Sequence, residues 1–128
     1  MYEWGSSCSG TYKVLNKDGL QELPVVNQID EFVIKLYLNN SSSPNQIDLT
    51  LSSNKTLGNS GLVCQISIES DNWTKQIIVD LVSNSNRQKI GLSGCSFHEI
   101  VGHSIRVTVN IGFNQQQQQA IDPPEEWS

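Results

Sequence analysis

The segment Ile105–Ile111 (IRVTVNI) alternates apolar and polar residues over its whole length. The same alternation occurs in Ile47–Leu51 (IDLTL) and Leu62–Ile68 (LVCQISI), and clusters of Asn, Ser and Gly separate such segments. Because successive side chains of a β-strand point to opposite faces, a period of two is typical of strands with one buried face. We therefore expect a protein built from short β-strands that are joined by turns.

This alternation predicts eight or nine strands along the chain, and no segment shows the sustained period of 3.6 residues that a helix requires. The pattern favours an all-β fold, namely a single antiparallel two-sheet sandwich of jelly-roll or immunoglobulin-like type, with a closed barrel as the alternative. The expected strands are Gly10–Asn16, Leu20–Val26, Glu31–Asn39, Gln46–Ser52, Leu62–Glu69, Trp73–Val82, Arg87–Leu92 and Ile105–Phe113, with a brief ninth at Phe97–Val101.

Three of these strands carry signals about their position in a sheet. Glu31–Asn39 (EFVIKLYLN) has apolar residues on both faces, which indicates an internal strand. Pro24 places its strand at an edge or a bend, because proline cannot donate a ladder hydrogen bond. Ile105–Phe113 has no such protection, so it is either a central strand or an edge that pairs with another chain.

Composition limits the kinds of partner. The 128 residues suit one domain, and the formal net charge is −5 with a pI of about 4.8. Nucleic acids and anionic membrane surfaces are bound through clustered positive charge, whereas the eight Lys and Arg residues here are scattered. We therefore expect no binding to nucleic acid and none to membranes.

The first residues have neither the basic start nor the apolar stretch of a secretory signal, and no segment has the ~20 apolar residues of a membrane span. We expect a soluble cytoplasmic protein. The chain has three cysteines, an odd number that is atypical of a disulfide scaffold. Cys64 lies on the apolar face of its strand and should be buried. Cys8 and Cys95 lie in turns rich in Ser and Gly and could be exposed, and the sequence leaves open whether they form a disulfide.

One short segment concentrates side chains that could do chemistry. Cys95, His98, Glu99 and His103 lie within nine residues, and all four are residue types that bind zinc. The two histidines are five positions apart, however, whereas the metalloprotease helix motif places them four apart. A metal site at residues 95–103 is therefore only the second alternative function. No nucleophile motif accompanies the segment, so we expect a protein that is not an enzyme and has no cofactor.

Trp73 is the candidate ligand-binding aromatic residue. It follows Asp71 and Asn72 at a turn, where an indole ring could be exposed among many amide side chains. Such rings form platforms for sugars, so a carbohydrate-binding, lectin-like module is the first alternative function. The competing interpretation is that the Trp73 ring covers the open end of the core.

The chain changes character after residue 113, which divides it into a sandwich domain (1–113) and a C-terminal tail (114–128). The five glutamines at 115–119 cannot form a core and predict a flexible spacer. The tail ends in candidate partner-binding residues, with Trp127 as a pocket anchor unless it folds back on the sandwich. The leading hypothesis is a non-enzymatic protein-interaction or assembly module, an adaptor that binds a protein partner or associates with itself through Pro123, Pro124, Glu125, Glu126 and Trp127.

Overall fold

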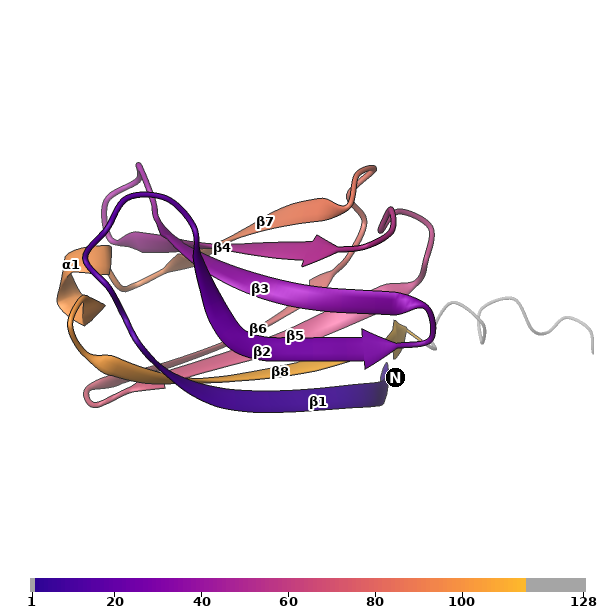
Figure 1. Ribbon diagram of the computed structural model, residues 1–128, viewed down its shortest axis with the longest axis horizontal. Helices are drawn as coiled ribbons and strands as arrows, with labels where there is room; N and C mark the ends of the chain where they lie inside the picture. The colour runs from indigo at the N-terminus through magenta and orange to yellow at the C-terminus, as the bar shows by residue number, and fades with distance from the viewer. Residues whose placement is uncertain (1, 115–128) are drawn as a thin grey trace, which may run out of the picture.

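Eight strands form two four-stranded antiparallel sheets that face each other, in a computed structural model that describes residues 2–114 (Figure 1). The β1 sheet has the order β1 (Tyr2–Lys13), β8 (Ser104–Asn114), β5 (Leu62–Ser70) and β6 (Trp73–Asp80). The β2 sheet has the order β2 (Gln21–Ile29), β3 (Phe32–Asn40), β4 (Gln46–Ser53) and β7 (Arg87–Ser93). The predicted all-β two-sheet sandwich is confirmed.

The core lies between the sheets and follows from the period of two. In β2 every second residue is buried from Gln21 to Ile29, and β8 buries Ile105, Val107 and Val109 in the same way. The internal position predicted for the third strand is confirmed, because β3 lies between β2 and β4. The most completely buried large side chains are Leu23, Ile34, Leu36, Leu38, Ile47, Leu49, Leu51, Leu57, Leu62, Ile66, Ile68 and Leu81.

The first strand begins much earlier than the sequence predicts. We expected it at Gly10–Asn16, whereas β1 spans Tyr2–Lys13 and pairs with β8 along that length. Residues 5–10 (GSSCSG) have small side chains, which hide the alternation there, and the two glycines lie close to β2. A Cβ atom at Gly10 would lie only 2.7 Å from the carbonyl oxygen of Pro24. The strand is thus defined by its pairing partner rather than by its own hydrophobic pattern.

A short helix, α1 (Phe97–Ile100), occupies the position of the predicted ninth strand. The backbone N–H of Ser96 donates to Glu99 Oε1 at 3.4 Å, and a serine followed three positions later by glutamate is a known helix-start pattern. Phe97 and Ile100 are buried, so the helix closes one end of the core. The strand prediction was wrong because this pattern competes with the apolar residues nearby.

The strand Ile105–Phe113, whose place the sequence left open, is central. β8 lies between β1 and β5, and it continues to Asn114, the last residue that the structure describes. Asn114, the first residue of the predicted tail, therefore belongs to β8. The rest of that tail (115–128), with its partner-binding residues, lies outside the described residues. The helix of residues 97–100 is too short to span a membrane, and the described chain has no other.

The two sheets are joined along β1 and β2. The buried Asn27 of β2 donates from Nδ2 to Ser6 Oγ in β1 and to the carbonyl oxygen of Val109 in β8, both at 3.1 Å. The hydroxyl of Tyr12 in β1 donates to Gln21 Oε1 in β2 at 2.8 Å. These bonds close one side of the sandwich, so the opposite side, where β6 and β7 are the edge strands, is the more open one.

Candidate protein-interaction edge

The backbone of β6 turns hydrogen-bonding groups toward open solvent. Just after β6, and in the same register, the N–H of Leu81 donates to the carbonyl oxygen of Leu62 at 3.0 Å. In an antiparallel pair, alternate residues point their backbone groups to the partner and the residues between point theirs away. The backbone N–H and C=O groups of odd-numbered residues of β6 therefore point to β5, and those of Thr74, Gln76 and Ile78 point to the open edge. Among the described strands only β5 pairs with β6.

Two bridges to the other sheet limit this free edge. At one end Gln88 of β7 donates from Nε2 to the carbonyl oxygen of Asp80 at 2.9 Å and accepts from the N–H of Val82 at 3.0 Å. At the other end Trp73 Nε1 donates to the carbonyl oxygen of Gly94 at 3.2 Å. The free groups between the bridges belong to Thr74, Gln76 and Ile78, which we call the open run.

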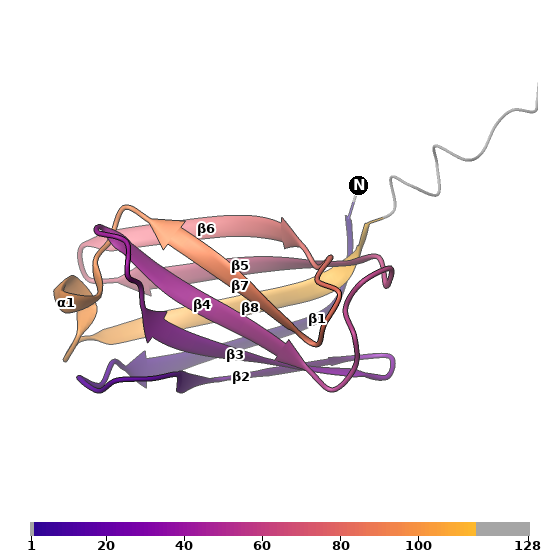
Figure 2. The same cartoon turned by 90° about the horizontal axis from the view of Figure 1, so that it is seen from above.

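Apolar side chains flank the open run on both faces of the sheet. On the inner face Trp73, Ile77 and Val79 pack against the core but stay half-exposed, and among the described strands β6 has a neighbour on one side only. On the outer face Ile78 is 45% exposed, and Val82, just beyond β6, is 68% exposed. Figure 2 shows β6 along one margin of the molecule. An edge strand of this kind is a template for pairing with another chain.

The other edge strands carry features that oppose pairing. On β7 the exposed Arg87 and Lys89 place positive charge on the outer face, and Lys89 Nζ lies 3.3 Å from the carboxylate of Asp48. β2 contains Pro24. β1, which lies beside β2, has a register shift in its pairing with β8 between Trp4 and Ser6. Charged side chains, proline and bulges are the usual means of blocking an edge. β6 has only Lys75 and Asp80.

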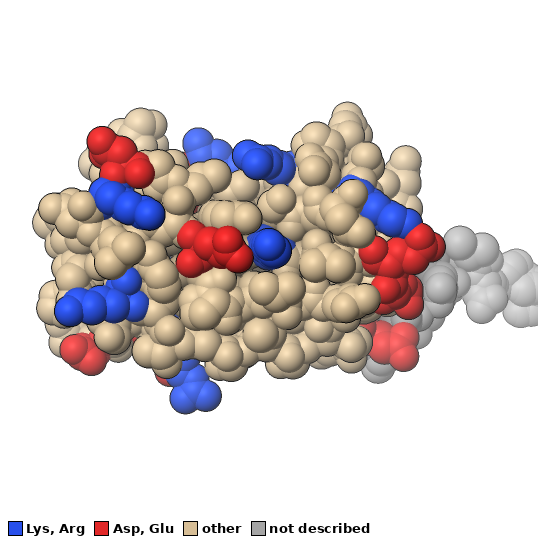
Figure 3. Space-filling view, in the orientation of Figure 1, with Lys and Arg blue, Asp and Glu red and all other residues tan. Residues whose placement is uncertain are grey.

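Charge is otherwise dispersed over the surface. Figure 3 shows acidic and basic side chains in small separate groups on the face it displays. Lys35 Nζ lies 3.8 Å from the Glu22 carboxylate, and Lys55 forms an ion pair with Glu31. The Lys55 ammonium group lowers the pKa of the Glu31 carboxyl, chiefly through their hydrogen bond. Both pairs are exposed, and such pairs contribute little to stability.

Trp73, the candidate sugar-binding residue, is half-buried at the start of β6 and packs against the core. Its indole N–H bonds to Gly94, whose own N–H donates to the carbonyl oxygen of Asn45 at 3.0 Å. Asn45 lines a hollow of about 450 Å³ that Asn and Ser residues largely surround. The ring thus covers the end of the core, one of the two interpretations of the sequence, while carbohydrate binding through it stays a prediction.

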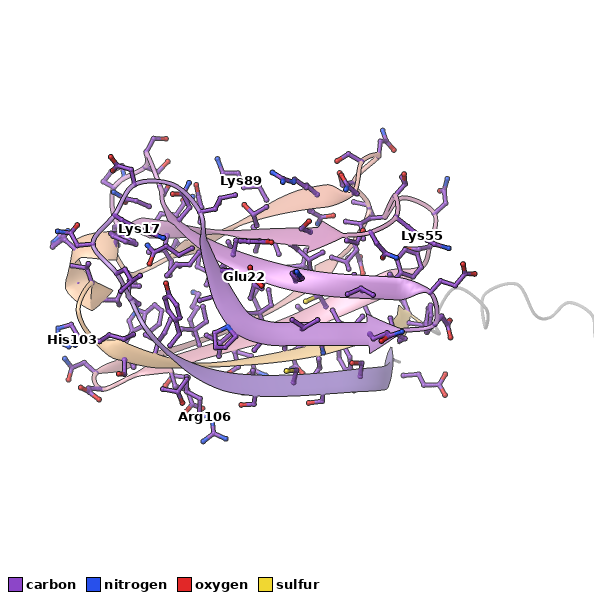
Figure 4. All side chains as sticks on the ribbon, viewed as in Figure 1. Lys17, Glu22, Lys55, Lys89, His103 and Arg106 are labelled. Atoms are coloured by element: carbon purple, nitrogen blue, oxygen red, sulfur yellow. The ribbon has the colours of Figure 1, made fainter. Side chains whose placement is uncertain are left out.

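The cluster at residues 95–103 is close in sequence but not arranged as a ligand set. Cys95 is buried, whereas His98, Glu99 and His103 are exposed, and Figure 4 shows His103 at one end of the molecule. Glu99 accepts from the Ser96 backbone, and His98 Nε2 lies 3.5 Å from Ser96 Oγ. Within residues 2–114, no group of three or more His, Cys, Asp or Glu side chains could hold a metal ion.

The three cysteines are all free thiols. The expected burial of Cys64 is confirmed, and Cys95 is also buried, while Cys8 is half-buried in β1. Burial raises the pKa of the Cys64 thiol to about 12. Burial, and to a lesser degree the nearby Glu99 carboxylate, raises the pKa of Cys95 to about 11. Because the thiolate is the nucleophile, these two thiols are unreactive near neutral pH.

Sequence reasoning missed the open run. Gln76 and Ile78 alternate like residues of any strand, and the strand order that exposes them depends on contacts far away in the sequence. A usable signal was present, namely the run Gln76–Val79 (QIIV), which has no charge and no proline. The structure therefore moves the candidate edge from Ile105–Phe113 to β6.

The fold and the edge define a two-sheet β-sandwich with one open, apolar edge strand. Comparisons with protein-family models, with curated proteins and with solved structures gave no match to this chain.

Proposed function

We propose that this protein is a non-enzymatic protein-interaction or assembly module. The observation that carries the proposal is the open run of β6, where Thr74, Gln76 and Ile78 offer backbone donors and acceptors to another chain. Pairing a strand there satisfies these groups and covers the half-exposed side chains beside them, so both hydrogen bonding and apolar burial favour association.

The C-terminal segment supplies a second contact in this proposal. Strand β8 holds the chain to Asn114, whose N–H donates to the carbonyl oxygen of Gly61 at 3.1 Å, so residues 115–128 start from a fixed point. Trp127 fills an apolar pocket of the partner, and the glutamates at 125 and 126 favour a basic rim around that pocket. Because proline has a fixed φ angle, Pro123 and Pro124 lower the entropy that this segment loses on binding.

Removal of the C-terminal segment tests this proposal. We expect a chain that ends at Asn114 to keep the melting temperature of the full chain within about 3 °C, because residues 2–114 already form both sheets and the core between them. The same truncation, and Trp127→Ala in the full chain, should abolish capture of the partner in a pull-down from cell extract. Gln119→Ala is the matched control in the same segment and should bind like the wild type.

Three outcomes count against the proposal. An unfolded truncated chain would show that the tail belongs to the core. Equal capture of the partner by the wild type and by Trp127→Ala would show that Trp127 does not contribute to the contact. Failure to bind any protein, together with binding to a glycan array that Trp73→Ala abolishes, would replace the proposal with the carbohydrate alternative.

A further inference from the structure

We propose that the partner of the β6 edge is a second copy of this chain, paired antiparallel about a two-fold axis at Gln76. This inference rests on the proposed function and names the partner of one of its two contacts. The two β6 strands then join two β1 sheets into one continuous eight-stranded sheet, since each contributes four strands. An interface of this kind uses the same patch on both copies, so the patch must be complementary to itself.

The bridges at the ends of the open run fix the register. Pairing that uses Asp80 or Val82 must displace the side chain of Gln88, which already occupies their outward backbone groups. Pairing centred on Gln76 uses only the free groups: Gln76 lies opposite Gln76 of the second copy, and Thr74 lies opposite Ile78. Both bridges stay intact on each copy, and all three residues of the open run obtain backbone partners.

The outer-face side chains match in this register. The two Gln76 amides meet at the axis, and each amide has both donors and an acceptor, so they bond reciprocally. Thr74 and Ile78 of the second copy are both β-branched, which is a favourable pair on a sheet surface. Asp80 falls opposite the neutral Asn72, so no like charges meet directly.

The inner face gains apolar burial. Trp73 lies opposite Val79 of the second copy, and Lys75 lies opposite Ile77, over which its aliphatic stem can pack while the ammonium group reaches solvent. Trp73, Ile77 and Val79 are the apolar residues of β6 that are half-buried in a single copy. The same contact therefore covers the exposed sides of these residues in both chains.

A second copy fits this edge better than it fits any other edge of the sandwich. Self-pairing of β7 places the positive residues Arg87 and Lys89 against a second set of the same charges. β6 instead carries one Lys and one Asp, which cancel, and its two copies present no facing like-charge pair. The short contact corresponds to weak association, with a dissociation constant on the order of micromolar or above.

The central position of residue 76 permits a charge-exchange experiment on the full chain. We expect the wild type to change from monomer to dimer with rising concentration in sedimentation equilibrium. Gln76→Lys and Gln76→Glu should each weaken association by about tenfold or more at low salt, because like charges then face each other at the axis. An equimolar mixture of the two variants should associate as heterodimers at least as well as the wild type.

Ser67→Lys is the matched control, because Ser67 pairs with Gln76 on the outer face but lies one strand inside the edge. This variant should associate like the wild type. A wild type that stays monomeric, a mixture no tighter than the single variants, or Gln76→Lys that associates more tightly would each overturn the pairing. Tighter association of Gln76→Lys would indicate a register in which Asp80 of the second copy lies opposite residue 76. A monomeric chain that still captures a partner through Trp127 overturns the pairing but leaves the proposed function standing.

Discussion

We expect Ile77→Pro to lower the free energy of unfolding by about 2–4 kcal/mol more than Ile77→Ala does, whereas Gln76→Pro and Gln76→Ala should differ by less than about 1 kcal/mol. The contrast follows from the direction of each backbone N–H. Ile77 lies opposite Ile66 with its N–H turned to β5, so proline leaves the buried Ile66 carbonyl oxygen without its donor. The N–H of Gln76 faces the open edge, and proline there removes no intramolecular bond.

Urea unfolding at low protein concentration measures these differences without a contribution from association. The alanine variants serve as controls, because they remove the same side chains and keep the N–H groups. If the two prolines have equal effects, or if proline at 76 is the more harmful, the backbone of β6 faces the other way and the open run is misplaced.

The second large effect is in the core. Ile66→Ala should lower the free energy of unfolding by about 2–5 kcal/mol, because Ile66 is completely buried between the sheets and its truncation leaves a cavity. Ile78→Ala is the matched control on the neighbouring strand. Its side chain is 45% exposed on the outer face, so the loss should be about 1 kcal/mol or less.

Chemical unfolding of both variants at low concentration gives the comparison. A loss below about 1 kcal/mol for Ile66→Ala would mean that the β1 sheet does not pack against the β2 sheet as described. A loss for Ile78→Ala as large as that for Ile66→Ala would mean that the outer face of β6 is covered in a single copy, which contradicts the open edge.

The sequence predicted the number and type of elements because side-chain alternation is local information. Seven of the expected strands correspond to β2–β8 with ends that differ by at most three residues. The extent of β1 could not be found this way, because residues 5–10 (GSSCSG) have small side chains that give no clear apolar alternation. The helix at Phe97–Ile100 was missed although Ser96 and Glu99 form a recognisable start signal.

The site was harder to predict than the fold, because an edge is a property of strand order. The uncharged run Gln76–Val79 does not by itself show that its strand has one neighbour, and nothing within Ile105–Phe113 shows that its strand has two. Sequence reasoning singled out Trp73, which the structure joins to Gly94, and Trp127, which lies outside the described residues. The open run can be identified only when it is known which residues of β6 direct their backbone groups to β5 and where the Gln88 side chain lies.

Hydrogen exchange at the backbone amides of β6, measured residue by residue at several protein concentrations, tests the open edge most directly. The amides of Thr74, Gln76 and Ile78 should exchange rapidly in dilute protein and become protected as concentration rises. The amides of Ile77 and Val79, which face β5, should be protected throughout and provide the internal reference. Protection of Gln76 that is already complete in dilute protein, or exchange that stays rapid at every concentration, would contradict an edge that pairs with a second copy.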